Sequence, residues 1–338
     1  MMNHRFFSGM LITTLLILNL GCEKEIILEP PEGLSRGVNL GNALEAPNEG
    51  DWGVVLEEKY FQLIKDAGFD FVRIPIRWSS HAEMEAPYQI DPGFFERIDW
   101  TVNQSISRDL AVIINIHHYI EIMNEPEENE SRFLALWQEI SDHYKNYPGN
   151  LYFELLNEPH DKLDNVIWNK YLQEAVKVIR ETNPNRTIIV GPTEWNNISE
   201  LEHLSLPVDD ENIVVTFHYY SPFEFTHQGA EWVDGSNKWL GTKWSGTSSE
   251  KEAIRRDLDK AVQWAKDRNR ALLLGEFGAY SKADMDSRVC WTSFVAREAE
   301  KRGIAWAYWE FCAGFGIYDP EAEKWRIKLL QALIPEAK

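Results

Sequence analysis

The sequence predicts a single α/β domain folded as a (β/α)8 TIM barrel. Eight short apolar runs recur along the chain, separated by segments with helical periodicity, and no long linker divides them. Several of these runs are continuously apolar, as strands covered on both faces require. Strand alternating with helix eight times indicates a parallel sheet that closes on itself. The chain has 338 residues, which is enough for such a barrel and its layer of helices.

The predicted strands are short and rich in β-branched or aromatic residues. They are RGVNLGN from residue 36, FDFVRIPI from 69, LAVIINIHH from 110, LYFELLNE from 151, TIIVGP from 187, NIVVTFHYY from 212, ALLLGEFG from 271 and IAWAYWEF from 304. Between them, apolar side chains repeat with a helical period over 56–67, 133–144 and 254–265. Ser249 and Glu252 indicate a capping box before the last of these helices.

The main structural alternative is a doubly wound open sheet that binds a nucleotide. That fold requires a phosphate-binding loop after its first strand, but GNALEAPNEGDWG contains neither G-x-G-x-x-G nor a Walker lysine. The barrel is therefore favoured. The formal net charge of −20 also argues against nucleic acid as a partner, because proteins neutralise phosphates with lysine and arginine. Its simplest consequence is solubility.

The first 33 residues are expected to lie outside the barrel. Residues 1–21 have a weakly basic start and an apolar stretch too short to span a membrane, which predicts a lipoprotein-type signal peptide. LNLGC resembles the lipobox of bacterial lipoproteins, and Cys22 would then carry a lipid. Residues 22–33 would form a tether, and residues 34–338 the single (β/α)8 domain of an exported protein. It would meet the membrane only through this anchor, at the cell surface or in the periplasm; ordinary secretion is the alternative.

Two cysteines, Cys290 and Cys312, remain once the leader is removed. Export would permit a disulfide between them. Each cysteine nevertheless lies in an apolar helix or strand pattern, where a free thiol packs as a small hydrophobic group. Two unpaired, buried thiols are therefore expected, although the spacing alone does not establish this.

Polar and aromatic residues gather where the predicted strands end. In barrel enzymes the reactive groups stand at the C-terminal ends of the strands, at one mouth of the barrel. The residues are Arg73 in the second strand, His117 and His118 in the third, Asn157 and Glu158 in the fourth, His218 and Tyr220 in the sixth, Glu276 in the seventh, and Trp309 and Glu310 in the eighth. Glu310 is expected to face away from the site, because adjacent strand side chains alternate.

Glu158 and Glu276 are the candidate catalytic pair. They end strands that are three apart in chain order, so their side chains can face each other across the mouth. Paired carboxylates suit cleavage of a glycosidic bond: one protonates the departing oxygen, and the other attacks the anomeric carbon or activates water. A carboxyl separation of about 5–5.5 Å predicts retention of configuration, and one of about 6.5–9.5 Å predicts inversion.

Seven motifs carry a resemblance to a known family: NLGNALEAP, VRIPIRWS, INIHHY, ELLNEPH, TFHYYSPFEFTHQGAEW, LGEFGAY and AYWEF. Together and in this order they resemble glycoside hydrolase family 5, most closely its endoglucanase (cellulase) branch that also accepts mannans. The resemblance runs from about Arg36 to the C-terminus. The Asn-Glu-Pro triplet is specific only in combination with the glutamate on the seventh strand.

The resemblance implies a retaining endo-β-1,4-glucanase that needs no cofactor or metal and acts on a β-linked polysaccharide such as carboxymethyl cellulose, mixed-linkage glucan or glucomannan. It implies that Glu158 is the general acid/base, with a raised pKa, and that Glu276 is the nucleophile. Asn157 would bind the sugar 2-hydroxyl. The remaining implied roles are Arg73 and Tyr220 beside the nucleophile, where they favour its ionised form, His117 and His218 as orienting histidines, Trp309 as a sugar platform, and Asn42, Glu45, His118 and Trp232 lining sugar subsites.

Other interpretations stay open at the level of sequence. The activity could be that of an endo-β-1,4-mannanase or a xyloglucanase, or the protein could be a catalytically silent glycan-binding lipoprotein. Zinc is disfavoured because His117 and His118 are consecutive on a strand and would face opposite ways. Arg73 could pair with another buried acid. The insertion at 221–250 carries Trp232, Trp239 and Trp244, which could be loop anchors. A monomer is assumed.

Overall fold

Eight parallel strands close into a barrel in chain order, which confirms the predicted (β/α)8 fold. The computed structural model describes residues 27–337. The barrel strands are β1 (Arg36–Asn39), β2 (Phe71–Ile74), β3 (Ala111–Asn115), β4 (Leu151–Glu154), β5 (Ile188–Val190), β6 (Ile213–His218), β7 (Leu272–Phe277) and β8 (Ala305–Tyr308). β1 pairs with both β2 and β8, and this second pairing closes the sheet.

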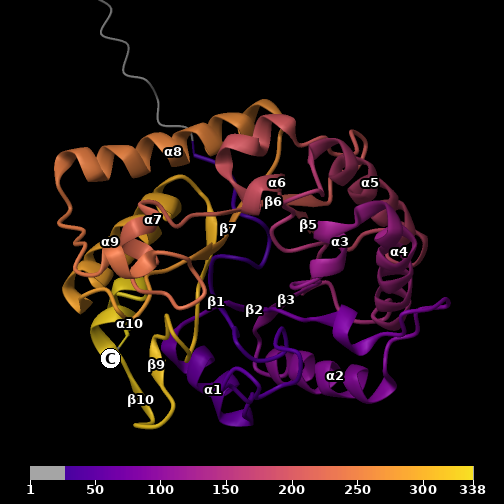
Figure 1. Cartoon of the computed structure of the whole chain (residues 1–338), viewed down its shortest axis with the longest axis horizontal. Helices are drawn as coiled ribbons and strands as arrows, with labels where there is room; N and C mark the ends of the chain where they lie inside the picture. The colour runs from indigo at the N-terminus through magenta and orange to yellow at the C-terminus, as the bar shows by residue number, and fades with distance from the viewer. Residues whose placement is uncertain (1–26, 338) are drawn as a thin grey trace, which may run out of the picture.

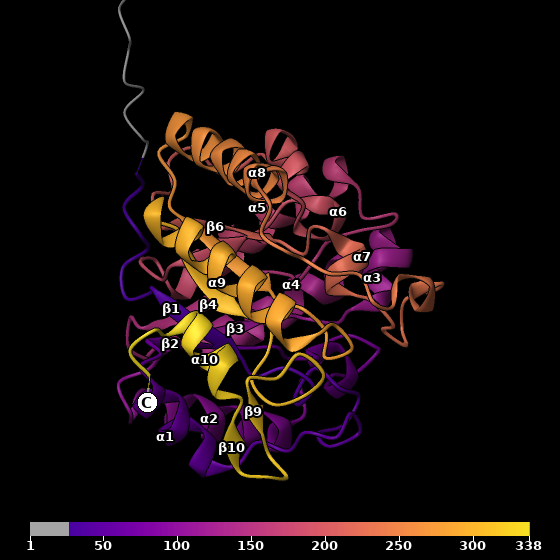
Figure 2. The same ribbon diagram turned by 90° about the vertical axis from the view of Figure 1, so that its left-hand side faces the viewer.

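Helices surround the barrel on its outside (Figure 1). The longer ones are α1 (Glu58–Ala67), α2 (Pro92–Ile106), α4 (Pro126–His143), α5 (Asn165–Thr182), α8 (Ser248–Asp267), α9 (Met285–Lys301) and α10 (Ile327–Leu333). The short elements are η1 (Trp78–His81), α3 (Ile120–Asn124), α6 (Thr193–Asn196), η2 (Ile198–His203), α7 (Phe223–Thr226), η3 (Ser236–Trp239), β9 (Tyr318–Asp319) and β10 (Lys324–Trp325). In Figure 2, α8, α9 and α10 lie one below another on the face turned to the viewer.

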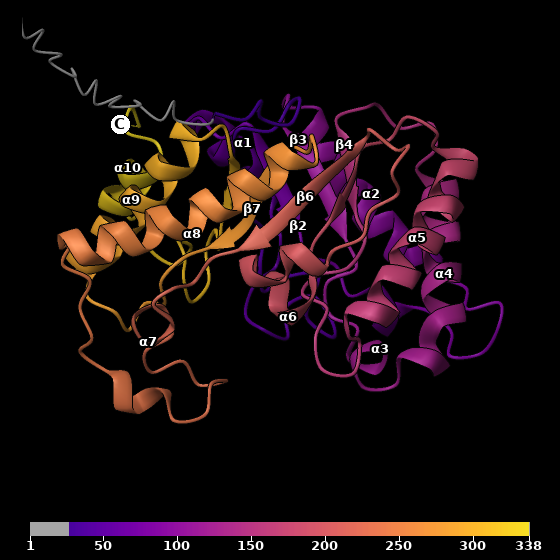
Figure 3. The same cartoon turned by 90° about the horizontal axis from the view of Figure 1, so that it is seen from above.

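The short helices α3, α6 and α7 lie together at one end of the barrel, opposite the C-terminus (Figure 3). Each follows the C-terminal end of a strand, so this end is the mouth at which barrel enzymes place their reactive groups. The insertion after β6 contains α7 and η3 and projects beyond the body of the molecule at this end.

The inside of the barrel is filled by alternate residues of its strands. One buried apolar layer contains Phe71, Ile113, Tyr152, Ile189, Val214 and Leu273. Side chains two residues further along a strand point to the same face. The next inward positions on β2, β3 and β4 are therefore Arg73, Asn115 and Glu154, all fully buried. A polar layer thus lies directly above the apolar one, and it forms the base of the mouth.

Three local predictions need correction. The capping box of α8 is formed by Thr247 and Glu250, two residues before the predicted pair of Ser249 and Glu252, because the helix begins earlier. β4 ends at Glu154, so Asn157 and Glu158 stand on the segment after the strand. Both cysteines are free, as predicted, and Cys312 is buried, but Cys290 is exposed on α9.

The predicted signal peptide, residues 1–21, and Cys22 lie outside the described residues. Of the predicted tether, residues 27–33 are described, and they contact the barrel. The Leu28 N–H donates to the Arg302 carbonyl at 2.9 Å, and the Tyr152 hydroxyl donates to the Glu32 carbonyl at 2.5 Å. Within residues 27–337, no helix has both the length and the apolar character needed to cross a membrane.

Candidate active site

Glu158 and Glu276 face each other at the mouth of the barrel. One oxygen of each carboxyl group lies within 4.8 Å of the other and of a ring nitrogen of His218. The His218 Nδ1 atom is 2.6 Å from Glu158 Oε1 and 3.7 Å from Glu276 Oε2. His218 is the last residue of β6, and Glu276 stands beside it in the register of β6 and β7. The two acids predicted from the sequence are therefore brought together, with this histidine between them.

Arg73 is the centre of the polar layer beneath the two acids. Its Nη1 atom donates to Glu276 Oε1 at 2.8 Å, and its Nε and Nη2 atoms donate to the two oxygens of Glu154 at 2.6 and 2.7 Å. Nη1 also donates to the Asn39 side-chain oxygen at 2.8 Å. Both interpretations of Arg73 are thus realised, because it binds the predicted nucleophile and a second buried acid. Its charge is shared between two carboxylates.

Glu154 and Asn39 are site residues that the sequence interpretation missed. Both are fully buried, and both reach Arg73. A signal for Glu154 was present, because it stands two residues after Tyr152 in a strand whose alternate residues face inward. A charged residue at such a position needs a partner of opposite charge.

Asn157 is held by Arg73, whose Nη2 atom donates to its side-chain oxygen at 2.8 Å. This contact fixes the orientation of the amide, so its NH2 group is the part left to donate to a ligand. Tyr220 donates its hydroxyl to Glu276 Oε2 at 3.0 Å. Glu276 therefore accepts hydrogen bonds on both oxygens, one from a cation and one from a phenol.

The two carboxyl groups differ in their electrostatic surroundings. Burial raises the pKa of Glu158 to about 7, against the opposing effects of Arg73 and His160. Burial also raises the pKa of Glu276, but His218 and Arg73 offset part of that rise. Burial lowers the pKa of His218 to about 4, so the imidazole is neutral near pH 7. The site thus contains a glutamic acid that can hold a proton near neutrality beside one bound directly to a guanidinium.

An aromatic surface lies next to the acid pair. Trp309 stacks on His117 with ring centroids 5.5 Å apart and an angle of 9° between the rings. His118 packs edge-on against Trp52, which is 41% exposed and was not predicted. The His117 and His118 rings lie 4.8 Å apart, so the prediction that they face opposite ways is wrong. β3 ends at Asn115, and strand alternation no longer applies beyond it.

Two further predictions concern glutamates near Trp309. Glu45 does not line an open subsite, because it is 1% exposed and its carboxylate accepts the backbone N–H groups of Asn42 and Ala43. It shapes the loop that presents Asn42, which is itself partly exposed. Glu310 lies away from the acid pair, as expected, and its carboxylate accepts backbone N–H groups of residues 312–315.

The tryptophans of the insertion have different environments. Trp232 is 60% exposed and packs edge-on against Tyr280. Trp244 is 2% exposed and packs against Phe294. Trp239 is partly buried against Phe223. Trp244 is therefore a loop anchor, whereas Trp232 offers an open ring face.

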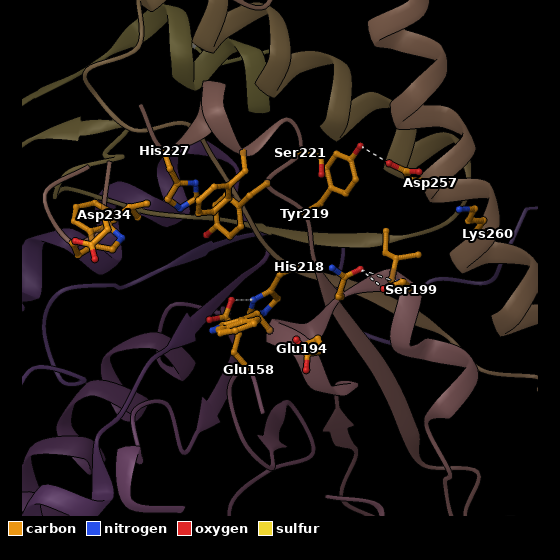
Figure 4. Close-up of a pocket in the computed structure, with 17 residues that line it drawn as sticks. Glu158, Glu194, Ser199, His218, Tyr219, Ser221, His227, Asp234, Asp257 and Lys260 are labelled. Carbon is orange, nitrogen blue, oxygen red and sulfur yellow. Dashed lines mark hydrogen bonds and ion pairs between the residues drawn. The ribbon is translucent and has the colours of Figure 1, made fainter. Parts of the chain in front are cut away.

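A cleft of about 940 Å³ contains Glu158, His218, Tyr220 and Trp232. In Figure 4, His227 and Asp234 lie on one side of the Glu158–His218 pair, and Asp257 and Lys260 lie on the other. Trp195 also lines this cleft, is 49% exposed and stacks on His160 at 4.9 Å. The sequence interpretation missed Trp195 and His227, because neither stands on a barrel strand.

The described residues contain one group that has the composition of a metal site, namely Glu158, His218 and Glu276. Both nitrogens of His218 already face protein partners. Nδ1 contacts Glu158, and Nε2 lies 3.2 Å from the Asn196 side-chain nitrogen. The geometry is accounted for by hydrogen bonds between an acid pair and a neutral histidine.

A (β/α)8 barrel with two facing carboxylates and an aromatic cleft at its C-terminal mouth defines the class of barrel glycoside hydrolases. Comparison with protein families gives the particular member of this class. The family described as Cellulase (glycosyl hydrolase family 5) matches residues 36–314. The chain belongs to this family, as its motifs predicted.

Relatives across the family are similar over most of this chain. Endoglucanase H of Acetivibrio thermocellus is 36% identical over 306 residues, which cover 89% of this chain and 33% of that protein. The chain thus spans about a third of the length of this relative. Among solved structures, Thermotoga maritima Cel5A in complex with mannotriose is 56% identical, with a TM-score of 0.88, covering 89% of this chain and 97% of that one. The cellulose synthase subunit Z from Clostridioides difficile is 44% identical, with a TM-score of 0.87, covering 89% and 99%.

Proposed function

We propose that this protein is an endo-β-1,4-glucanase that acts by a retaining double displacement. The observation that carries the proposal is the approach of Glu158 and Glu276, with one oxygen of each within 4.8 Å. This close approach favours the retaining geometry, in which the carboxyl groups are about 5–5.5 Å apart, over the inverting geometry of about 6.5–9.5 Å.

In the first step, Glu276 attacks the anomeric carbon while Glu158 gives its proton to the glycosidic oxygen. The bond to the leaving sugar breaks, and a covalent glycosyl ester forms on Glu276. Arg73 and Tyr220 hold both oxygens of Glu276 and so fix its direction of attack. The Asn157 NH2 group is oriented to donate to the sugar 2-hydroxyl as positive charge develops on the ring.

In the second step, Glu158 takes a proton from water, and the water oxygen attacks the anomeric carbon and releases Glu276. Glu158 ends the cycle protonated, and Glu276 ends it ionised. Esterification of Glu276 removes its negative charge, which lowers the pKa of Glu158 and prepares it to act as a base. A pKa near 7 in the free enzyme suits a group that must first give and then take a proton.

Endo action is supported by two separate sets of aromatic rings near the acid pair. Trp309, His117, His118 and Trp52 form a continuous set of contacting rings. His160 follows Glu158 by two residues and carries Trp195 on its ring. Two separate sets of rings offer stacking surfaces for more than one sugar of a chain, as cleavage within a chain requires.

A second candidate substrate is β-1,4-mannan. Thermotoga maritima Cel5A, 56% identical to this chain, has been crystallised both with mannotriose and with cellobiose. We expect activity on glucomannan as well as on glucan. A panel of carboxymethyl cellulose, mixed-linkage glucan, xyloglucan, glucomannan and galactomannan, ranked by kcat/KM, identifies the preferred chain.

The proposal is tested by chemical rescue. Glu276→Ala should lose activity on carboxymethyl cellulose, and azide should restore turnover of an activated aryl cellobioside with formation of the α-glycosyl azide. Glu158→Gln should cleave the polysaccharide at least 100-fold more slowly, because general acid catalysis contributes about 10²–10⁴. The matched control is Glu130→Gln, a surface glutamate paired with Lys170. Normal cleavage by either active-site variant would exclude the mechanism, and a protein that releases no reducing ends would be a glycan-binding protein instead.

The lipid anchor is a separate proposal, which rests on the sequence LNLGC. If Cys22 is acylated, metabolic labelling with a palmitate analogue should tag the wild-type protein, and Cys22→Ser should be unlabelled and released from membranes. Equal labelling of both proteins would contradict acylation at this cysteine, and no labelling of either would support ordinary secretion.

A further inference from the structure

The ring of His218 is held on its far side by Asn196, a residue outside the predicted site. Asn196 is fully buried, and its Nδ2 atom lies 3.2 Å from His218 Nε2. The other ring nitrogen, Nδ1, is the one that contacts Glu158. A chain of contacts therefore leads from a buried amide, through an imidazole, to the proposed general acid.

The backbone that places this amide is strained. Glu194, Trp195 and Asn196 are consecutive and have φ angles of 53°, 59° and 56°, in the left-handed region that non-glycine residues rarely adopt. Such strain persists where the surrounding structure fixes it and is found most often at functional sites. The turn places Trp195 toward the cleft and Asn196 toward the barrel interior.

The amide is also fixed by close packing. A Cβ atom at Gly191 would come within 2.1 Å of the Asn196 Oδ1 atom, so only glycine leaves room for it. The Oδ1 atom is buried and has no hydrogen-bond partner among residues 27–337. On the other side, Gly275 gives space to the ring, because a Cβ atom there would lie 3.1 Å from His218 Nε2. An unpaired buried acceptor costs stability, and here it accompanies an amide whose NH2 group points at the histidine.

We propose that Asn196 is a positioning residue that holds His218 in the neutral Nδ1–H tautomer and thereby places the acid proton of Glu158. An amide NH2 can only donate, so His218 Nε2 must be the unprotonated nitrogen. The single ring proton is then on Nδ1 and is donated to Glu158 Oε1 at 2.6 Å. Because Oε1 accepts this hydrogen bond, the carboxyl proton of Glu158 resides on Oε2, from which it is transferred to the leaving group. The inference rests on the proposed function of Glu158.

The opposite amide orientation would have a different chemical result. Oδ1 would accept a hydrogen bond from a protonated Nε2, and the unprotonated Nδ1 would accept a hydrogen bond from the carboxyl proton of Glu158 itself. The acid would then be held by the histidine instead of by the substrate. The two arrangements differ in the position of one ring proton, which can be observed directly.

The charged and titratable groups around His218 come from several elements. They are Glu154 from β4, Glu158 after β4, Glu276 from β7, Arg73 from β2, His117 after β3 and Tyr220 after β6, with His160 facing Glu158. On the turn of Asn196 itself, Glu194 is exposed. Since the ring is neutral near pH 7, a change in its protonation would add a positive charge directly beside Glu158.

The test combines ¹⁵N NMR of ring-labelled histidine with pH profiles of kcat/KM. In the wild-type protein the His218 signals, identified by their loss in His218→Gln, should show a protonated Nδ1 and an unprotonated Nε2. Asn196→Asp replaces the donor with a carboxylate, which should turn His218 into an imidazolium. Its positive charge should lower the pKa of Glu158 and move the basic limb of kcat/KM down by about one pH unit or more.

The matched control is Asn197→Asp, which adds the same charge one residue away. Asn197 is exposed, and its side chain caps η2 through the Ser199 N–H, a role that aspartate also performs. Its basic limb should stay where the wild-type limb is. Asn196→Gly removes the amide from a left-handed position that glycine adopts freely, and the His218 signals should then show a mixture of tautomers.

Two results would overturn the inference while leaving the proposed function intact. One is a wild-type His218 that carries its proton on Nε2. The other is a basic limb that shifts equally in Asn196→Asp and Asn197→Asp, which would mean that only distant charge is acting. In contrast, loss of the proposed function would appear as failure of azide rescue, with the tautomer unaffected.

Discussion

Replacing Glu154 with glutamine tests whether the charge of Arg73 is shared between two carboxylates. The substitution keeps the size of the side chain but removes a negative charge that contacts Arg73 at 2.6 and 2.7 Å with both groups fully buried. Breaking a buried ion pair by removing one partner costs about 3–5 kcal/mol. Arg73 still has Glu276 as a partner, so we expect a loss near the lower end, about 3 kcal/mol.

The same substitution should change the pH profile of activity. Without Glu154, the positive charge of Arg73 acts more fully on Glu276 and lowers its pKa, so the acidic limb of kcat/KM moves to lower pH. Glu154 also raises the pKa of Glu158, so its removal moves the basic limb in the same direction. We expect the whole bell-shaped pH profile of kcat/KM to shift to lower pH by about one unit.

Urea denaturation at pH 7 and kcat/KM between pH 4 and pH 9 measure the two effects. The control is Glu130→Gln, which breaks a surface ion pair with Lys170 at 2.6 Å. This substitution should lower the free energy of unfolding by at most about 1 kcal/mol and leave the pH profile of kcat/KM unchanged. A Glu154→Gln protein that is as stable as this control and has an unchanged pH profile would refute the claim that Glu154 and Glu276 share the charge of Arg73.

Three further predictions follow from the site. Tyr220→Phe removes a donor to Glu276 at 3.0 Å. The transition state should lose about 1.5–3 kcal/mol of stabilisation, so kcat/KM should fall roughly 10- to 150-fold; an unchanged rate would exclude the contact from catalysis. Trp232→Ala should raise KM with little effect on stability. Trp244→Ala, at a 2% exposed anchor, should lose about 3–5 kcal/mol of stability. If the two variants changed KM equally and the free energy of unfolding equally, the assignment of Trp232 to sugar binding and Trp244 to loop anchoring would be wrong. Burial raises the pKa of Glu45 to about 8, so between about pH 4.5 and pH 8 the folded state binds more protons than the unfolded state. The free energy of unfolding of the wild type should therefore fall as the pH rises through this window. In Glu45→Gln this contribution is absent, and the free energy of unfolding should fall less steeply.

The barrel could be predicted because its strands are short, apolar and regularly spaced. Hydrophobic runs such as 110–118 and 271–278 need cover on both faces, and a parallel sheet layered with helices provides it. The ends of the strands also indicated where Glu158, Glu276, Arg73 and His218 would meet. These residues converge because the closure of the sheet, through the pairing of β1 with β8, brings all the strand ends to one rim.

The parts of the site that sequence did not reveal depend on loops and on contacts between distant segments. Glu45 looked like a subsite residue, but its carboxylate turns back to bind the N–H groups of its own loop. His117 and His118 leave β3 before strand alternation could separate them. Asn196 reaches His218 only through three left-handed residues, and a pattern of side-chain types carries no information about such a backbone.

The configuration of the first sugar product is the most direct test of the central claim that Glu158 and Glu276 act as acid/base and nucleophile across one glycosidic bond. The measurement is ¹H NMR of the anomeric region during the first minutes of hydrolysis of a cello-oligosaccharide, before mutarotation. The account predicts that the β-anomer of the newly released reducing end appears first. Initial appearance of the α-anomer would contradict the double displacement and the roles assigned to both glutamates.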